Sequence, residues 1–189
     1  DPAFFHVIFT EFTSTDGLCH PVGCKNVISR LLVNDTEREV LKNKGFKIVA
    51  QIWGADPEKF YQATKLICTE MQFDGIDINM GCPVKKIVKQ GGCSALIGRP
   101  MLAKEIIQAT KEASDLPVSI KTRTGTKKHD TENWIGALLE NDPAAIILHA
   151  RTQKDMSDVP ADWREIKKAV SVRDQMKKDI PVLGNGDVI

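Results

Sequence analysis

Short segments rich in valine and isoleucine alternate along this chain with longer segments in which apolar residues recur every three or four positions. Strands that alternate with helices are typical of parallel βα units, which are joined by right-handed crossovers. The sequence predicts six strands, one around Ile76 and Ile78 and the others at residues 6–12, 47–53, 116–122, 144–149 and 181–183. This pattern predicts an α/β fold with a parallel sheet.

Four helices are predicted between these strands, at about residues 57–71, 101–114, 131–140 and 163–172. The first has a clear start signal, because Asp56 can cap it and Pro57 suits the first helical position. Residues 34–44 are predicted to form a turn or a short solvated helix, and residues 16–23 a loop.

A polar residue closes each predicted strand, at intervals of about 28 to 42 residues that suit one βα unit each. In a parallel barrel the carboxyl ends of all strands share one face, and the active site forms there. We therefore expect these side chains to converge: Glu11, Gln51, Asn79, Lys121, His149 and Asn185.

The predicted fold class is a parallel (β/α)8 TIM barrel, represented by about six of its eight βα units. A complete barrel takes about 250 residues, so six strands in 189 residues fall short of closure. A doubly wound open sheet is the alternative, but it would place a G-x-G-x-x-G turn after its first strand. No such turn follows residues 6–12, which favours the barrel.

The strand around Ile76 and Ile78 ends at Gly81-Cys82-Pro83, where glycine permits and proline enforces a turn. Residues 85–92 contain three lysines and two glycines and are predicted to form a mobile basic loop. A cysteine thiol has an ordinary pKa of about 8.5, which nearby lysines can lower. Cys82 is therefore a candidate reactive thiol, whereas Cys93 is predicted only to pack.

Composition excludes several classes of protein. A net charge of +1 leaves only local patches for RNA binding. No apolar run approaches the roughly 20 residues of a membrane span. Five cysteines, an odd number, indicate free thiols in a reducing compartment, and hence the cytoplasm. Cys19 and Cys24 flank His20, but no second ligand pair has matching spacing, so no metal site is predicted.

Five motifs occur in the order found in a known family of flavoenzymes. The motifs are Gln51-Ile52-Trp53-Gly54, Asp77-Ile78-Asn79-Met80-Gly81-Cys82-Pro83 with Gly91-Gly92-Cys93-Ser94, Lys121-Thr122-Arg123-Thr124-Gly125, His149-Ala150-Arg151-Thr152 and Gly184-Asn185-Gly186-Asp187. In content and order they resemble the tRNA-dihydrouridine synthases, which reduce the C5–C6 double bond of uridines in tRNA. The bacterial B-type branch of that family is the most similar.

The resemblance implies a TIM-barrel domain that binds FMN, with NADPH as reductant, tRNA as partner, and neither a membrane nor a metal. It implies that Cys82 is the proton donor and that Asn79 and Arg123 contact the uracil. It implies these flavin contacts: Gln51, Lys121, His149, Asn185, Gly186 and Asp187. Residues 1–189 would then be a partial catalytic domain, with one strand expected before Asp1, another after Ile189, and a helical C-terminal tRNA-binding domain absent.

Two other functions remain open from the sequence. Small-molecule pyrimidine or dihydroorotate oxidoreductases are also flavin barrels with an asparagine near a Cys-Pro pair, and a module could grip tRNA without turnover. Residues 154–160 stand where the family usually has Tyr-x-Gly, so the choice of uridine is not predicted. The sequence does not indicate the oligomeric state.

Overall fold

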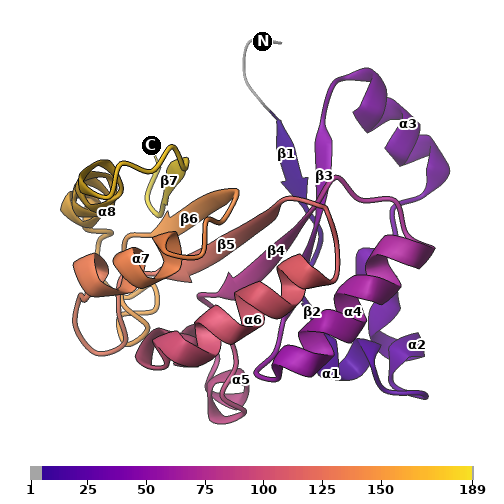
Figure 1. Cartoon of the computed structure of the whole chain (residues 1–189), viewed down its shortest axis with the longest axis horizontal. Coiled ribbons are helices and arrows are strands. Elements are labelled where there is room, and N and C mark those ends of the chain that lie inside the picture. Colours follow the sequence, from indigo (N-terminus) through magenta and orange to yellow (C-terminus); the bar gives the residue numbers. More distant parts are fainter. Residues whose placement is uncertain (1–5, 189) are drawn as a thin grey trace.

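The structure is a computed structural model that describes residues 6–188, and it centres on a parallel sheet (Figure 1). The strand order, β1-β3-β4-β5-β6-β7, follows the chain without a reversal. A doubly wound sheet would reverse its order at a switch point, so the barrel prediction is confirmed and the alternative is wrong. The strands are β1 (Val7–Phe9), β2 (Thr13–Ser14), β3 (Lys47–Trp53), β4 (Gly75–Met80), β5 (Val118–Arg123), β6 (Ala145–His149) and β7 (Val182–Asn185).

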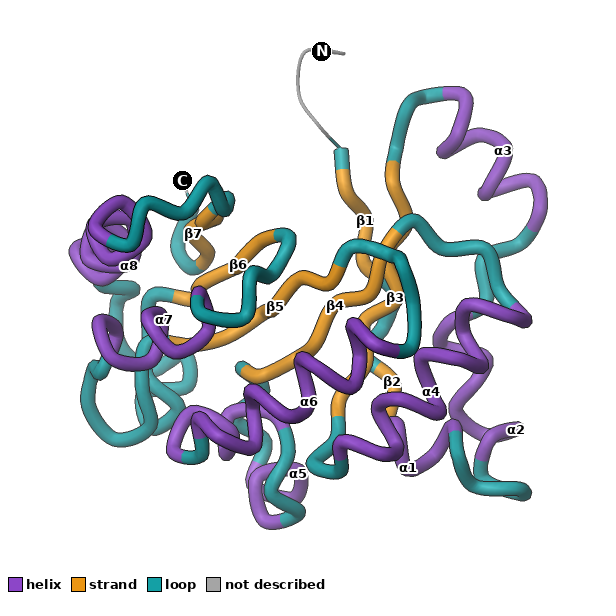
Figure 2. Tube along the Cα trace, viewed as in Figure 1, coloured by secondary structure: helices purple, strands orange, loops and turns teal. Residues whose placement is uncertain are grey.

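Helices alternate with the strands, and Figures 1 and 2 show α4, α6 and α7 along one side of the sheet. Each of the four predicted long helices is present to within a few residues at either end. The helices are α1 (Thr15–Leu18), α2 (Cys24–Val27), α3 (Asp35–Asn43), α4 (Pro57–Glu70), α5 (Lys85–Lys89), α6 (Pro100–Glu112), α7 (Thr131–Leu139) and α8 (Trp163–Gln175), with 3-10 helices η1 (Ile28–Leu31) and η2 (Cys93–Gly98).

The hydrophobic core lies between the sheet and these helices. Successive side chains on a strand point to opposite faces, so the fully buried Ile76 and Ile78 of β4 share the core face, while Asp77 faces the other way. Helix α4 begins as predicted, because the Asp56 side chain accepts the backbone N–H of Glu58 at 3.0 Å. The face of the sheet opposite the core therefore carries polar side chains that could take part in a reaction.

The first predicted strand is interrupted. Phe9 pairs with Val49 and Thr13 with Ile52, so the stretch holding β1 and β2 has one residue more than the part of β3 opposite it. An extra residue of this kind is a bulge, which redirects nearby side chains. The Glu11 side chain is 79% exposed and lies 3.9 Å from Arg30. The prediction that Glu11 joins the converging polar residues is therefore wrong.

Two segments predicted as loops contain short helices. Residues 85–92 include α5, which the backbone N–H groups of Ile87 and Val88 close by bonding the carbonyl of Val84. Residues 16–23 overlap α1. Ser14 stabilises the start of that helix by accepting the backbone N–H of Gly17. Glycines in both segments, with lysines in residues 85–92, favoured a loop prediction, yet a single turn of helix needs only a few local bonds.

The sheet is open, with β1 and β7 at its two edges. Both edges leave large apolar side chains exposed, with Phe9 at 38% and Leu183 at 48%. Because β1 and β2 both pair with β3, the seven strands occupy six positions in sequential parallel order. These six positions agree with the predicted six of eight units of a barrel. Over residues 6–188, no helix combines the length and the apolar character needed to span a bilayer.

Candidate active site at the carboxyl ends of the strands

A buried carboxylate links the three strands β3, β4 and β5. Gln51 donates from Nε2 to one oxygen of Asp77 at 2.8 Å, and Ser119 donates from Oγ to the other at 2.6 Å. Burial raises the pKa of Asp77, although both hydrogen bonds oppose the rise. Because Nε2 of Gln51 must point to Asp77 to donate this hydrogen bond, the Gln51 amide is held in one orientation.

Asn79 holds the turn that carries the candidate thiol. Its Oδ1 accepts the backbone N–H of Gly81 at 3.1 Å and that of Cys82 at 3.0 Å. Its Nδ2 donates to Gln51 Oε1 at 3.0 Å and keeps a second hydrogen for another acceptor. In this geometry one asparagine can cap the turn and still donate to a ligand.

Cys82 lies partly exposed where β4 ends, and its pKa is lowered to about 6. The largest cause is a hydrogen bond with the thiol of Cys93. Burial opposes that effect, while the backbone N–H of Val84 and the charge of Arg123 add to it. Cys93 is fully buried, and its partner and its burial raise its own pKa. At pH 7 Cys82 is therefore mainly a thiolate whose partner keeps its proton.

Arg123 ties the turn after β4 to the loop after β6. It donates from Nε to the carbonyl of Gly81 at 2.9 Å, and from Nη1 to the carbonyls of Thr152 and Met156 at 3.0 and 2.8 Å. Arg123 as a residue is 6% exposed, so it does not act as a surface ion-pair residue. Within residues 6–188 its Nη2 makes no hydrogen bond, which leaves that group free to donate to a ligand.

Lys121 reaches across β6 to the last strand. Its Nζ donates to Asn185 Oδ1 at 3.0 Å, so the ends of β5 and β7 are joined by their side chains. Burial lowers the pKa of Lys121 to about 8, while the charge of Asp77 acts in the opposite direction. The ammonium therefore stays mostly protonated at pH 7.

His149 is neutral in this site. Burial lowers its pKa to about 4, with the charges of Arg123, Lys121 and Arg151 acting in the same direction. Nη1 of Arg151 lies 3.0 Å from Nε2 of the imidazole. Because a guanidinium can only donate, Nε2 is the acceptor and the ring proton is on Nδ1. His149 can thus offer an N–H from Nδ1.

The loop after β7 is braced by an ion pair. Asp187 accepts two hydrogen bonds from Nη2 of Arg151, both at 2.7 Å, and the backbone N–H of Ala161 at 2.8 Å. Gly186 has φ +103°, and a Cβ there would lie 2.8 Å from the His149 ring. The Asp187 side chain therefore holds the loop, and the absence of a side chain at Gly186 lets the loop pass against the imidazole.

Hydrogen bonds and strand pairing bring most of the predicted residues together at the carboxyl ends of the strands. The set comprises Gln51, Asn79, Cys82, Lys121, Arg123, His149, Asn185, Gly186 and Asp187. Their cofactor and substrate roles stay predictions. A hollow of about 530 Å³ between β1 and α3, lined in part by Ile8 and Leu41, contains none of them.

Sequence reasoning missed three residues of this site. Asp77 alternates with Ile76 and Ile78, and that spacing alone indicates that it shares a face with Asn79. Arg151 lies within the motif His149-Ala150-Arg151-Thr152, but no local sequence signal reveals its partners. The sequence predicts only packing for Cys93, because no local sequence signal shows that the fold brings it next to Cys82.

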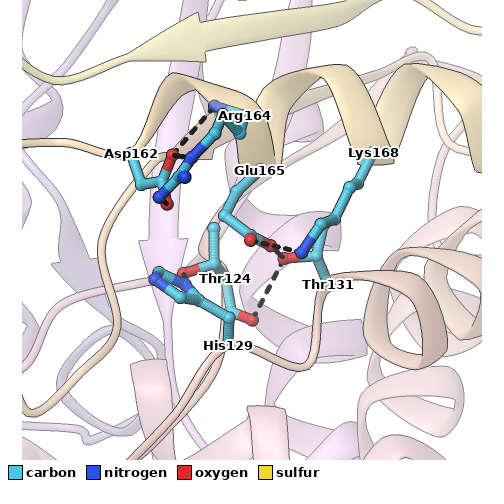
Figure 3. Close-up of polar contacts among 7 residues, drawn as sticks. All are labelled: Thr124, His129, Thr131, Asp162, Arg164, Glu165 and Lys168. Carbon is cyan, nitrogen blue, oxygen red and sulfur yellow. Dashed lines mark hydrogen bonds and ion pairs between the residues drawn. The ribbon is translucent and has the colours of Figure 1, made fainter.

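A second polar cluster lies in the loops that follow β5 and β6 (Figure 3). His129, Asp162 and Glu165 each offer one ligand atom, and these atoms lie within 4.8 Å of one another. Both carboxylates already have cations, since Asp162 pairs with Arg164 at 2.7 Å and Glu165 with Lys168 at 2.6 Å. A metal ion would have to displace both cations, so the cluster is better explained as a clamp between loops and helix starts.

Comparisons with known proteins identify the family. A family model described as "Dihydrouridine synthase (Dus)" matches residues 6–189. A "Probable tRNA-dihydrouridine synthase" of Staphylococcus aureus (strain COL) is 43% identical, over 96% of this chain and 53% of its own length. A "Probable tRNA-dihydrouridine synthase 2" of Bacillus subtilis (strain 168) is 41% identical over the same shares.

Among solved structures, the 3-hexulose-6-phosphate synthase of Salmonella typhimurium matches with a TM-score of 0.43 and 13% identity, over 79% of this chain and 69% of its own. That likeness is too weak to support an argument. This chain spans about half the length of the curated relatives it matches. The extent of the family match and the identity to these relatives show that the chain belongs to the dihydrouridine synthase family.

Proposed function

We propose that the protein containing this chain is a tRNA-dihydrouridine synthase that reduces the C5–C6 double bond of uridine in tRNA, with FMN as cofactor and NADPH as reductant. Membership of the family supports the reaction. The observation that carries the proposal is a partly exposed thiol, Cys82, held by Asn79 at the same strand ends as Lys121 and His149. We also propose a cytoplasmic location, which free thiols and a tRNA substrate would support.

The hydrogen-bond donors at the carboxyl ends of the strands suit a flavin. The pyrimidine edge of a flavin presents carbonyl oxygens and ring nitrogens, which an ammonium and a neutral imidazole N–H can bond. Gly186 leaves room for close backbone approach, where a Cβ would meet His149. When bound, FMN supplies the hydride. The residues proposed to hold it are Gln51, Lys121, His149, Asn185 and Gly186, with Asp187 bracing their loop.

Cys82 is proposed to deliver the proton that the substrate needs. Reducing an α,β-unsaturated carbonyl system requires a proton at uridine C5 as well as a hydride at C6. Cys82 would act as the general acid, while Arg123 Nη2 and the remaining Nδ2 hydrogen of Asn79 donate to the uracil carbonyl oxygens. Since the thiol pKa is about 6, activity should fall as the pH rises through that value.

The test is an assay of the full-length protein. Purified protein should be yellow and should consume uridine in unmodified tRNA only when NADPH is present. Free uracil and orotate are tested in parallel. Turnover of orotate alone would replace the proposal with a small-molecule oxidoreductase, and colourless protein that binds tRNA would replace it with a binding module.

A pair of cysteine variants tests the assignment of the acid. Cys82→Ala should retain flavin and lose about 10²-fold or more of its turnover, the range that general acids contribute. The matched control is Cys68→Ala, which removes a partly buried thiol on α4 that contacts Ser114 at 3.1 Å. This control should keep full turnover. Equal activity of both variants would remove Cys82 from the proton-donor role.

A further inference from the structure

The second thiol at the active site has no role in the proposed reaction. Cys93 begins η2 and is fully buried, and its thiol lies close enough to Cys82 to lower the pKa of that residue. Its neighbour Ser94 donates to the Cys82 carbonyl twice, from the backbone N–H at 3.3 Å and from Oγ at 2.8 Å. These bonds hold the start of η2 against the end of β4, so Cys93 lies beside Cys82.

The two thiols differ in exposure and protonation. Cys82 is partly exposed and mainly a thiolate at pH 7, whereas Cys93 is buried and protonated. Peroxides oxidise accessible thiolates, and a nearby second thiol can then condense with the sulfenic acid. The pair therefore combines an exposed nucleophile with a sheltered partner.

The backbone at Cys93 is unusual for its residue type. Cys93 has φ +51°, in the left-handed region that non-glycine residues seldom adopt. Such strain tends to occur at functional sites. Gly91, at φ +82°, and Gly92 precede it, which gives this connection to α5 more freedom than a bulkier sequence would have. A disulfide needs a sulfur-sulfur separation of about 2.05 Å, so this connection must let the two sulfurs approach to that distance.

We propose that Cys82 and Cys93 form a peroxide-sensitive pair in which Cys93 resolves oxidised Cys82 to a disulfide. The Cys82 thiolate attacks one oxygen of hydrogen peroxide, the O–O bond breaks, and hydroxide leaves. The Cys93 sulfur then attacks the sulfenic sulfur, the S–S bond forms, and water leaves with the thiol proton. Two thiols are oxidised and one peroxide is reduced, and a dithiol reductant reverses the change.

The consequence for turnover rests on the proposed function, because a disulfide removes the assigned proton donor. The bond itself does not depend on that function. It also protects the active-site sulfur, since a sulfenic acid that is not resolved can be oxidised further and irreversibly.

The experiment maps the bond by mass spectrometry. Full-length protein is treated with hydrogen peroxide, blocked with N-ethylmaleimide and digested with trypsin. Trypsin leaves Cys68 and Cys82 on one peptide, so all proteins carry Cys68→Ser. A peptide joining Cys82 to Cys93 should appear and should vanish after treatment with dithiothreitol. In the additional variant Cys93→Ser, dimedone should label Cys82 persistently.

Turnover on tRNA is followed in the same samples. Activity lost to peroxide should return fully with dithiothreitol when Cys93 is present. In Cys93→Ser the recovered fraction should fall as peroxide exposure is prolonged, because the unresolved sulfenic acid is oxidised further and irreversibly. A linked peptide in protein without dihydrouridine activity would support the thiol pair and refute the proposed function. Absence of the linked peptide at every peroxide concentration, in folded protein, would overturn the pair whatever the activity.

Discussion

Replacing Cys93 by alanine should raise the pKa of Cys82. The Cys93 hydrogen bond is the largest of the effects that hold this pKa at about 6. A hydrogen bond to a charged group contributes about 1.5–3 kcal/mol, and about 1.36 kcal/mol corresponds to one pKa unit. The variant should therefore have a Cys82 pKa higher by about 1 to 2. The Val84 N–H and the Arg123 charge remain, so the value should stay below that of a free thiol.

The assay measures how fast iodoacetamide alkylates Cys82 as a function of pH, with the modification located at Cys82 and quantified by tandem mass spectrometry. Only the thiolate reacts, so the midpoint of the rate profile reports the pKa. Cys68→Ala is the control, because its thiol contacts Ser114 and is not among the groups that shift Cys82. An unchanged midpoint in folded Cys93→Ala would refute the reasoning that Cys93 sets the state of the active-site sulfur.

The same variant tests the proton donor through its pH dependence. If Cys82 gives the proton, only its thiol form is active, and kcat/KM falls as the pH rises through its pKa. In Cys93→Ala this falling limb should move to higher pH by the same amount as the alkylation midpoint. A limb that stays in place while the midpoint moves would assign the proton to another group.

Two further predictions concern the loops around the site. Gly186→Ala should destabilise the fold by about 1–3 kcal/mol and weaken flavin retention, because it combines strain at φ +103° with a clash against the imidazole. Gly45→Ala, at φ +76° with nothing within 4 Å, is the control for backbone strain alone, and equal losses in urea unfolding would exclude the clash. Burial opposes ionisation of Glu165, but bonds from Lys168 and Thr131 outweigh it and lower its pKa, so its stabilisation is full above about pH 4.3 and is lost as the pH falls. Thr131→Val should therefore lose about 1–3 kcal/mol at pH 7 and show a weaker acid dependence, and an unchanged dependence would contradict this.

The clamp between α7 and α8 explains why the second of these predictions concerns stability and not catalysis. Thr131 is the first residue of α7 and Glu165 lies in the first turn of α8 (Figure 3). Their hydrogen bond joins two helix starts that follow neighbouring strands. Losing it should loosen the loop that follows Arg123 and the loop that contains Arg151, without removing a group that contacts a ligand.

The sequence by itself determined the order of strands and helices and the residues at the strand ends. Strand β3 was predicted with the bounds that the structure has, and α4 began at the predicted cap. These features depend on contacts within a few residues, such as the alternation of Ile76, Asp77 and Ile78 or the bond from Glu58 to Asp56. Periodicity and capping chemistry are visible without knowledge of the fold.

Only the tertiary structure decided which side chains share a site and in what state. The bulge that removes Glu11 depends on pairing with β3, and Cys93 meets Cys82 only because η2 packs beside the end of β4. The protonation of Cys82, Lys121 and His149 follows from burial and from charges brought in by distant segments. Electrostatic and hydrogen-bond partners act through space, so residues far apart in the sequence set the chemistry of each group.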